Sequence, residues 1–331
     1  MAVDQEKLEA FLGKMVNDMG AGASGVLVLI GDQLGLYKEI AKNGGVTSQE
    51  LADRTDTPER YMREWLAAQA ASGYVECAVE TNRFSMTPEQ IAVFADEDSP
   101  VFMMGGFYAI ASTYIDEPKV TEAFRTGKGV SWGDHNQCLF CGTEKFFRPG
   151  YRANLTTTWI PALDGVEEKL KNGGRMADVG CGHGASTLVM AEAYPNSTFV
   201  GFDFHEPSVE HAREMAKEAG LDNVTFEVAT AKEYPGEGYD LVACFDCLHD
   251  MGDPEGAAAH VFETLDGDGT WLIVEPFAHD TLAENLNPVG RVYYSFSTTI
   301  CTPSSLSQEV GLGLGAQAGE KRLCEVVTSG G

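Results

Sequence analysis

Arg175-Met-Ala-Asp-Val-Gly-Cys-Gly-His-Gly-Ala-Ser186 is the stretch that decides the fold of this chain. A short apolar run containing an acid passes into glycines at 180, 182 and 184 and then into an apolar helical pattern. Glycine lets the bare backbone approach a ligand where a Cβ would collide. The free N–H groups of a helix that begins at Ala185 would point back into that gap. The pattern predicts a strand, a ligand-binding turn and a helix.

Strand-like and helical stretches alternate from Gly174 onward. This alternation predicts a doubly wound, mostly parallel α/β sheet of the Rossmann-like kind. Ligands bind such sheets at the carboxyl ends of the strands, so residues there are the first candidates for a site. Strands are predicted at Arg175–Val179, Thr198–Asp203, Asn223–Val228, Tyr239–Phe245 and Thr270–Glu275, and helices at Ala185–Ala193, Ser208–Ala219 and Pro254–Leu265.

The first part of the chain predicts a mainly helical winged-helix domain. Helices are predicted near Asp4–Met19 and at Val26–Ala41, and a third begins at Thr47 or Ser48. A fourth runs from Pro58 to Ser72 with Thr57 as its cap. Short runs at 74–77 and 83–86 then predict a two-stranded wing. We expect three parts: this domain at 1–95, a helical connector at 96–170 and the α/β domain at 171–331.

The net charge is the most informative bulk property. The 331 residues carry a formal charge of -27. Such a field repels phosphate backbones, so nucleic-acid binding is disfavoured. The start of the sequence lacks the pattern of a secretory signal, and the apolar run Val26–Ile30 stops at Asp32, too short to cross a membrane. With eight cysteines that we expect to be reduced, a cytoplasmic protein is predicted.

Two Cys-x-x-Cys pairs raise the question of a metal site. Cys138/Cys141 and Cys244/Cys247 lie about a hundred residues apart, unlike the short spacing of zinc ribbons. Cys244 lies in a predicted strand, from which the neighbour at 247 is not expected to face it. No metal is predicted.

The acid and glycines of the opening stretch resemble motif I of class I S-adenosylmethionine-dependent methyltransferases, in which this turn holds the methionine part of the cofactor. Gly180, Gly182 and Ala185 also fit a dinucleotide fingerprint, and a structural turn without a ligand is a further alternative. Asp178 and the third glycine favour the methyltransferase.

Asp203 ends the next strand, where a carboxylate accepts hydrogen bonds from a ribose diol. The predicted cofactor residues are Asp178, Gly180, Cys181, Gly182, Gly184, Asp203, Phe204, Thr230, Ala231, Phe245 and Asp246. Thr230 departs from the family, which often has an acid there for adenine.

Leu248-His249-Asp250, after the fourth strand, resembles a segment of small-molecule O-methyltransferases in which the histidine is the general base. A hydroxyl is a poor nucleophile until its proton is removed, and an imidazole can remove it near neutral pH. The resemblance places Glu275 on the histidine as an orienting carboxylate. His249, Glu275 and Asp250 are therefore the predicted catalytic residues. A histidine without acid–base chemistry remains an alternative, and His135 is a second candidate for the base.

The connector is unusually aromatic, and glycines and prolines make 126–151 at least partly loop. Aromatic side chains beside a cofactor domain are candidates for a flat apolar pocket, although core packing explains many of them. The predicted substrate-binding residues are Trp132, His135, Phe146, Phe147 and Tyr151.

Taken together, the chain resembles bacterial class I methyltransferases that carry an N-terminal winged-helix domain. The resemblance implies a homodimer formed through that domain and a small, aromatic or apolar acceptor methylated at oxygen. The family ends its sheet with two more strands after a last helix, which we predict at about Thr302–Val327. Either these two strands are missing or the edge of the sheet is left open, and we favour the first. A cofactor-binding transcriptional regulator and a nicotinamide dehydrogenase are alternatives; Glu59 and Glu64 beside the arginines of the fourth helix disfavour the regulator.

Overall fold

The computed structural model describes residues 3–331. The prediction that the chain lacks a secretory signal is based on a segment that begins with Met1 and Ala2, and these two residues lie outside the described part of the chain. Contacts divide the chain into two compact units. The first runs to Ala111 and includes Cys141–Pro149, and the second comprises Ser112–Phe140 and Gly150–Gly331.

Helix α1, Gln5–Gln33, is continuous, so the prediction of separate helices before and after Gly20 is wrong. The break comes at Gly35, whose φ of +66° starts α2, Leu36–Asn43. Position 31, inside α1, requires glycine, because a Cβ there would lie 2.5 Å from the Tyr37 ring and 2.6 Å from the Trp65 ring. In the described chain no single helix is long and apolar enough to span a membrane; only α1 and α2 taken together, bent by 68°, satisfy length and composition.

The rest of the first unit has the predicted winged-helix order. Helix α3, Ser48–Thr55, is capped by Thr47, one of the two predicted starts, in a capping box. Helix α4, Glu59–Ala71, is preceded by Pro58 in the cap position, so the prediction of Thr57 as cap is wrong; its hydroxyl lies 2.9 Å from that of Thr55 instead. The antiparallel pair β1, Glu76–Ala78, and β2, Arg83–Ser85, forms the wing, and α5, Pro88–Phe94, follows. The core includes Val28, Leu36, Tyr37, Ile40, Leu51, Met62, Trp65, Leu66 and Phe94.

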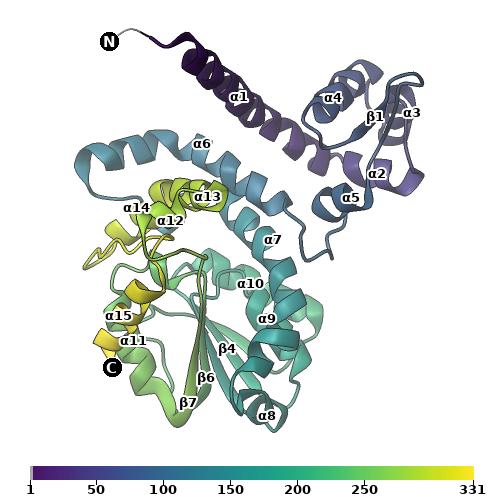
Figure 1. Ribbon diagram of the computed structural model, residues 1–331. Helices are drawn as coiled ribbons and strands as arrows, with labels where there is room; N and C mark the ends of the chain where they lie inside the picture. The colour runs from purple at the N-terminus through teal and green to yellow at the C-terminus, as the bar shows by residue number, and fades with distance from the viewer. Residues whose placement is uncertain (1–2) are drawn as a thin grey trace. The chain divides into compact units, whose positions relative to one another are not determined.

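The second unit is built on a five-stranded sheet in the order β5-β4-β3-β6-β7, with every neighbouring pair parallel. This is the predicted Rossmann-like sheet (Figure 1). The apolar side chains of β3 and β6 are buried because helices cover both faces of the sheet. The strands are β3, Arg175–Val179, β4, Thr198–Asp203, β5, Val224–Val228, β6, Tyr239–Phe245, and β7, Leu265–Val274; the connecting helices are α9, Ala185–Ala193, α10, Glu206–Ala219, and α11, Pro254–Thr264.

Helices α6, Met104–Thr126, and α7, Gln137–Asn154, each contribute residues to both units. Between them, Trp132–Asp134 forms a single 3-10 turn, η1, in the predicted loop. The chain then passes through the π-helical turn η2, Leu155–Trp159, the 3-10 turn η3, Ile160–Ala162, and α8, Val166–Lys171, before it enters β3.

The helix predicted across Thr302–Val327 is wrong: the region forms α14, Thr302–Leu306, and α15, Glu320–Gly330. Glycines 311, 313 and 315 lie between them with φ of +64°, +65° and +74°, which a right-handed helix cannot accommodate. Helix α15 packs closely against α11 (Figure 1), since a Cβ on Gly330 would lie 2.5 Å from that of Ala258. After β7 come α12, Leu282–Asn285, α13, Pro288–Phe296, and the π-helical turn η5, Ser297–Cys301, which runs into α14.

Candidate functional site

The turn after β3 contains three glycines in a backbone conformation that favours glycine. Gly180, Gly182 and Gly184 have φ of +77°, +52° and +78°, all in the left-handed region that favours glycine. A Cβ on Gly180 would lie 2.7 Å from Cys247 Sγ, and one on Gly184 would lie 2.7 Å from the Phe226 ring. A Cβ on Gly182, by contrast, would have no atom within 4 Å. Two of the glycines therefore serve packing, whereas Gly182 leaves open space in front of the turn.

Asp178, on β3, fixes the turn to the following helix. Its Oδ2 accepts hydrogen bonds of 2.7 Å from Ser186 Oγ and from Thr187 Oγ1, in the first turn of α9. Its Oδ1 is buried and has no hydrogen-bond partner among residues 3–331. Burial raises the pKa of this carboxyl to about 6, against the two hydroxyl contacts that lower it. An unpartnered buried acceptor beside an open turn suits a ligand that brings a donor.

Asp203, the last residue of β4, lies directly across from the turn. Its Oδ2 accepts a 2.9 Å hydrogen bond from Gly182 N, and its Oδ1 accepts one of 2.8 Å from His205 N. The carboxylate is 8% exposed, and burial raises its pKa. Phe204, next in the chain, is 47% exposed. Ala229 N donates to Asp203 O at 3.0 Å, which brings the segment after β5, with Thr230 and Ala231, to the same edge.

The end of β6 presents Phe245 and Asp246. Asp246 has a φ of +53°, uncommon for a residue with a Cβ, and its N–H donates to Val274 O at 2.7 Å. Tyr151 OH donates to Asp246 Oδ2 at 3.0 Å, and the Tyr151 ring lies 5.4 Å from that of Phe245. Burial, and then the charge of Glu275, raises the pKa of Asp246 to about 7. The structure therefore brings the predicted Tyr151 to the predicted cofactor edge.

His249 is buried in the 3-10 turn η4, Leu248–Asp250, between two carboxylates. Its Nδ1 pairs with Glu275 Oε2, and its Nε2 lies 3.2 Å from Asp250 Oδ1. Glu275 follows β7 directly and also accepts a 2.8 Å hydrogen bond from Leu248 N. The three predicted catalytic residues are thus side by side, with Glu275 in the predicted orienting position on the ring.

Both ring nitrogens of His249 face acids, and this sets its charge. Burial alone would lower the pKa of the ring, but the charges of Asp250 and Glu275 outweigh it and raise the pKa well above its usual value. Burial also raises the pKa of Asp250, against the lowering effect of His249. A ring held as imidazolium at neutral pH can donate a proton, but it has no lone pair with which to accept one.

Three cysteines, Cys244, Cys247 and Cys301, lie near this edge of the sheet and are possible metal ligands. Burial raises the pKa of Cys301, close to His249 and Asp250, to about 12 and keeps it a neutral thiol. The Cys247 thiol donates to Val179 O at 3.1 Å, and the nearby Cys244 together with burial raises its pKa, so it is also a neutral thiol. Protonated thiols and a protonated imidazole are poor metal ligands. We assign no metal to these groups.

His135 follows η1 and is 6% exposed. Its Nδ1 lies 3.1 Å from Asp116 Oδ2, and its Nε2 is buried without a hydrogen-bond partner in the part of the chain that the structure describes. The Trp132 ring lies 6.4 Å from the ring of His135 and 5.5 Å from that of Phe140, which in turn stacks on His205 at 4.8 Å. His205 comes two residues after Asp203, so this aromatic group lies at the carboxyl end of β4.

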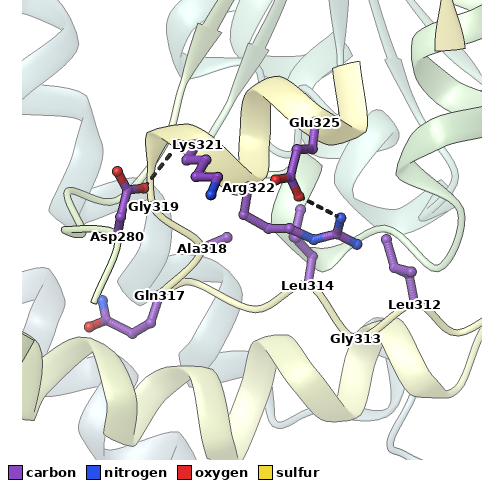
Figure 2. Close-up of a pocket in the computed structure, with 10 residues that line it drawn as sticks. All are labelled: Asp280, Leu312, Gly313, Leu314, Gln317, Ala318, Gly319, Lys321, Arg322 and Glu325. Atoms are coloured by element: carbon purple, nitrogen blue, oxygen red, sulfur yellow. Dashed lines mark hydrogen bonds and ion pairs between the residues drawn. The ribbon is translucent and has the colours of Figure 1, made fainter. Parts of the chain in front are cut away.

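The remaining predicted substrate residues, Phe146 and Phe147, belong to the first unit, and their rings lie 5.1 Å apart. The second unit also has a pocket of about 430 Å³ at the start of α15, lined by Asp280, Gln317, Lys321, Arg322 and Glu325 among others (Figure 2). None of the predicted site residues lines this pocket.

Sequence reasoning missed two residues of the site. Asp116 lies within α6, far from any motif, and only its contact with His135 reveals it. Tyr293 lies in α13; burial, and then the charge of Asp246, raises its pKa, which places it near the end of β6. An acid in a helix and a tyrosine in a helix carry no sequence signal by themselves.

The residues present fit S-adenosylmethionine. The open space at Gly182, the unpartnered Asp178 Oδ1 and the adjacent Asp203 carboxylate offer room, an acceptor and a diol-binding group on one edge. Phe204, Thr230 and Ala231 lie on the same edge and could enclose an adenine ring.

Two family models match the chain: residues 170–312 match the methyltransferase domain and residues 22–95 match the Rv2258c-like winged HTH domain. A curated relative, the 27-O-demethylrifamycin SV methyltransferase of Amycolatopsis mediterranei (strain S699), is 40% identical over 132 residues, which are 37% of this chain and 48% of that protein. The chain spans about half the length of the first curated relatives it matches, 47% and 48%.

Solved structures match over almost the whole chain. Human N-acetylserotonin methyltransferase in complex with S-adenosylmethionine superposes with a TM-score of 0.66 at 16% identity, over 100% of this chain and 94% of that one. An O-methyltransferase family protein from Burkholderia thailandensis gives a TM-score of 0.68 at 16% identity, over 99% and 93%. At these identities the likeness shows the fold.

Proposed function

Because this chain matches a methyltransferase domain behind a winged helix-turn-helix domain, we propose that it uses S-adenosylmethionine to methylate a small aromatic or apolar acceptor at oxygen. The open backbone at Gly182, between Asp178 and Asp203, is the observation that carries this proposal. A packed structural turn would have filled that space with side chains, as it does at Gly180 and Gly184.

The residues at the sheet edge take separate roles in the proposal. Asp203 holds the ribose diol, and Phe204, Thr230 and Ala231 enclose the adenine. Asp178 and the glycine turn hold the methionine part. Bound S-adenosylmethionine supplies an activated methyl group and a neutral thioether as leaving group, so the protein has to align the acceptor and remove its proton.

An oxygen acceptor is supported by the buried imidazole of His135, whose Nε2 makes no hydrogen bond within the described chain. A sulfonium needs no acid to leave, so a buried imidazole serves best on a hydroxyl that must lose its proton. Small acceptors are in keeping with the rifamycin-type and N-acetylserotonin substrates in the names of the similar proteins. Trp132 and Tyr151 provide apolar walls on the second unit for such an acceptor.

We also propose a cytoplasmic homodimer formed through α1. Leu8, Leu12, Met15, Met19, Val26 and Ile30 are 37–70% exposed. Their spacing of three, four and seven residues places them along one stripe of the helix. An apolar stripe this long on one helix is typical of an interaction surface, and a second copy of the same stripe would cover it.

The winged helix-turn-helix match favours one other function, a cofactor-binding transcriptional regulator. The charges of α4 argue against it. Arg60 pairs with Glu64 at 2.6 Å and Arg63 pairs with Glu59 at 2.8 Å, so both arginines are already neutralised within the helix. DNA would have to compete with these pairs and with a net charge of -27.

Titration calorimetry with S-adenosylhomocysteine tests the cofactor site. Gly182→Ala places a methyl group in the open space in front of the turn, and we expect it to weaken binding at least tenfold. Gly220→Ala is the matched control, because Gly220 also has a left-handed φ, +66°, and open space around it, but ends α10. Both variants should lose about 1 kcal/mol of stability from backbone strain. Equal affinities for the two variants, or no binding by the unaltered chain, would contradict the proposed cofactor site.

A further inference from the structure

The search for the base leads to His135 rather than to His249. We infer that His135, oriented by Asp116, is the general base that accepts the acceptor's hydroxyl proton, and that His249 is a fixed cation of the site. This inference rests on the proposed function and names the group that acts in it. It differs from the sequence prediction, which placed His249 in that role.

The contacts of Asp116 fix which nitrogen of His135 is available. Asp116 is buried, and its Oδ2 faces His135 Nδ1 at 3.1 Å and accepts a 2.7 Å hydrogen bond from Asn136 N. Its Oδ1 pairs with Lys119 Nζ at 2.9 Å. Burial raises the pKa of Asp116, but Lys119, Asn136 N and His135 together lower it below its usual value. An ionised Asp116 accepts a hydrogen bond from the Nδ1–H group, so the lone pair of a neutral ring is on Nε2.

Nε2 of His135 is the unpartnered atom of this pair. The ring is 6% exposed, and Nε2 makes no hydrogen bond within the described chain. A buried acceptor without a donor is costly to a folded protein and calls for a bound group that supplies one. The hydroxyl of an acceptor is such a donor.

Neighbouring elements place His135 over the cofactor edge. Val130 N donates to Pro303 O at 3.0 Å, which ties the segment before η1 to α14, and Phe140 stacks on His205 after β4. Asp250, in η4 after β6, is close enough for its charge to act on His135. Asp250 Oδ1, which pairs with His249 Nε2 at 3.2 Å, therefore belongs to the surroundings of both histidines.

The charge states of the two histidines fit this division. Burial lowers the pKa of His135 more than Asp116 and Asp250 raise it, and Lys119 lowers it further, so the ring is neutral at pH 7. His249 has the opposite state, because acids face both of its nitrogens.

The proposed reaction balances: the hydroxyl proton passes to His135 Nε2, the oxygen lone pair forms the O–CH3 bond, and the S–CH3 electron pair stays on sulfur. His135 then returns its proton to water.

Long-range 1H–15N NMR of the seven histidines in the full chain saturated with S-adenosylhomocysteine tests the inference directly. Assignment uses His135→Gln and His249→Gln. We expect His135 at pH 7 to be neutral with its proton on Nδ1, and His249 to be doubly protonated. Asp116→Asn should redistribute the His135 tautomers, whereas Lys119→Gln, which leaves the Oδ2 contact intact, should not. A His135 that is charged or protonated on Nε2 at pH 7 overturns the inference.

Turnover separates this inference from the proposed function. S-adenosylhomocysteine release is measured with S-adenosylmethionine and catechol, 1-naphthol or a 4-hydroxybenzoate ester. We expect His135→Gln to lower kcat about 100-fold or more with unchanged S-adenosylhomocysteine affinity, and the rate of the unaltered chain to rise with pH through a pKa below 6.5. Full turnover by His135→Gln overturns the base assignment. No turnover by the unaltered chain with any phenol contradicts the acceptor class instead, and the NMR result then decides the role of His135.

Discussion

At the scale of single residues, Asp246 combines an unusual backbone with an unusual charge state. It is left-handed, with a φ of +53°, and burial raises its pKa to about 7 from an ordinary 3.8. Between these two pH values the unfolded chain releases a proton that the folded chain retains. Its contribution to the free energy of unfolding is therefore full below about pH 4 and is lost as pH rises through about 7.

Asp246→Asn should remove this pH dependence, because asparagine tolerates the left-handed backbone and does not ionise. We expect the loss of stability between pH 5 and 8 to be smaller in the variant than in the unaltered chain, by at most about 1.4 kcal/mol per pH unit. Urea denaturation at a series of pH values measures this. Asp222→Asn, an exposed position, removes the same charge and serves as control. Parallel pH curves for Asp246→Asn and the unaltered chain would rule out a proton retained at Asp246.

At the scale of elements, helix α1 has a stripe of exposed apolar side chains, which a monomer would leave in contact with water. Leu12 and Met19 are 52% and 70% exposed, seven residues apart on one face. We expect Leu12→Glu with Met19→Glu to convert a dimer into a monomer in light scattering after gel filtration. Burial of one such side chain contributes about 1.5–3 kcal/mol, so each change should weaken the dimer at least tenfold.

Asn17→Glu is the matched control for α1. It adds the same charge at an exposed position two residues before Met19, on the other side of the helix. A dimer that survives in the double variant, or one that is lost equally in the control, would show that the stripe is not the interface. An unaltered chain that is monomeric would exclude the proposed dimer.

At the scale of the whole molecule, charge opposes folding. Fifty acids face 23 basic residues, so folding concentrates a net charge of -27 in a compact volume. Screening this repulsion should stabilise the protein. Raising NaCl from about 0.02 M to about 0.5 M, where the screening length is below about 10 Å, should move the urea midpoint upward. Sodium chloride is preferred to sulfate, which also strengthens apolar burial. A midpoint that falls with salt would mean that the ion pairs outweigh the repulsion.

Local patterns predicted much of this protein. The glycine turn, the strand and helix alternation and the Thr47 cap are properties of adjacent residues, and they recur in the structure with nearly the predicted bounds. The prediction failed where local signals were ambiguous. The predicted helices left a gap between Met19 and Val26, but one helix continues through it, and the turn comes at Gly35.

What the sequence by itself determined is the parallel sheet and the turn at its centre, because glycine spacing and hydrophobic periodicity are encoded within a few residues. Only the tertiary structure decided the state of the candidate site. Asp116 meets His135 across 19 positions of chain, and His249 meets Glu275 across 26. Burial and opposing charges then set which imidazole is neutral, and neither property belongs to a residue until the chain has packed around it.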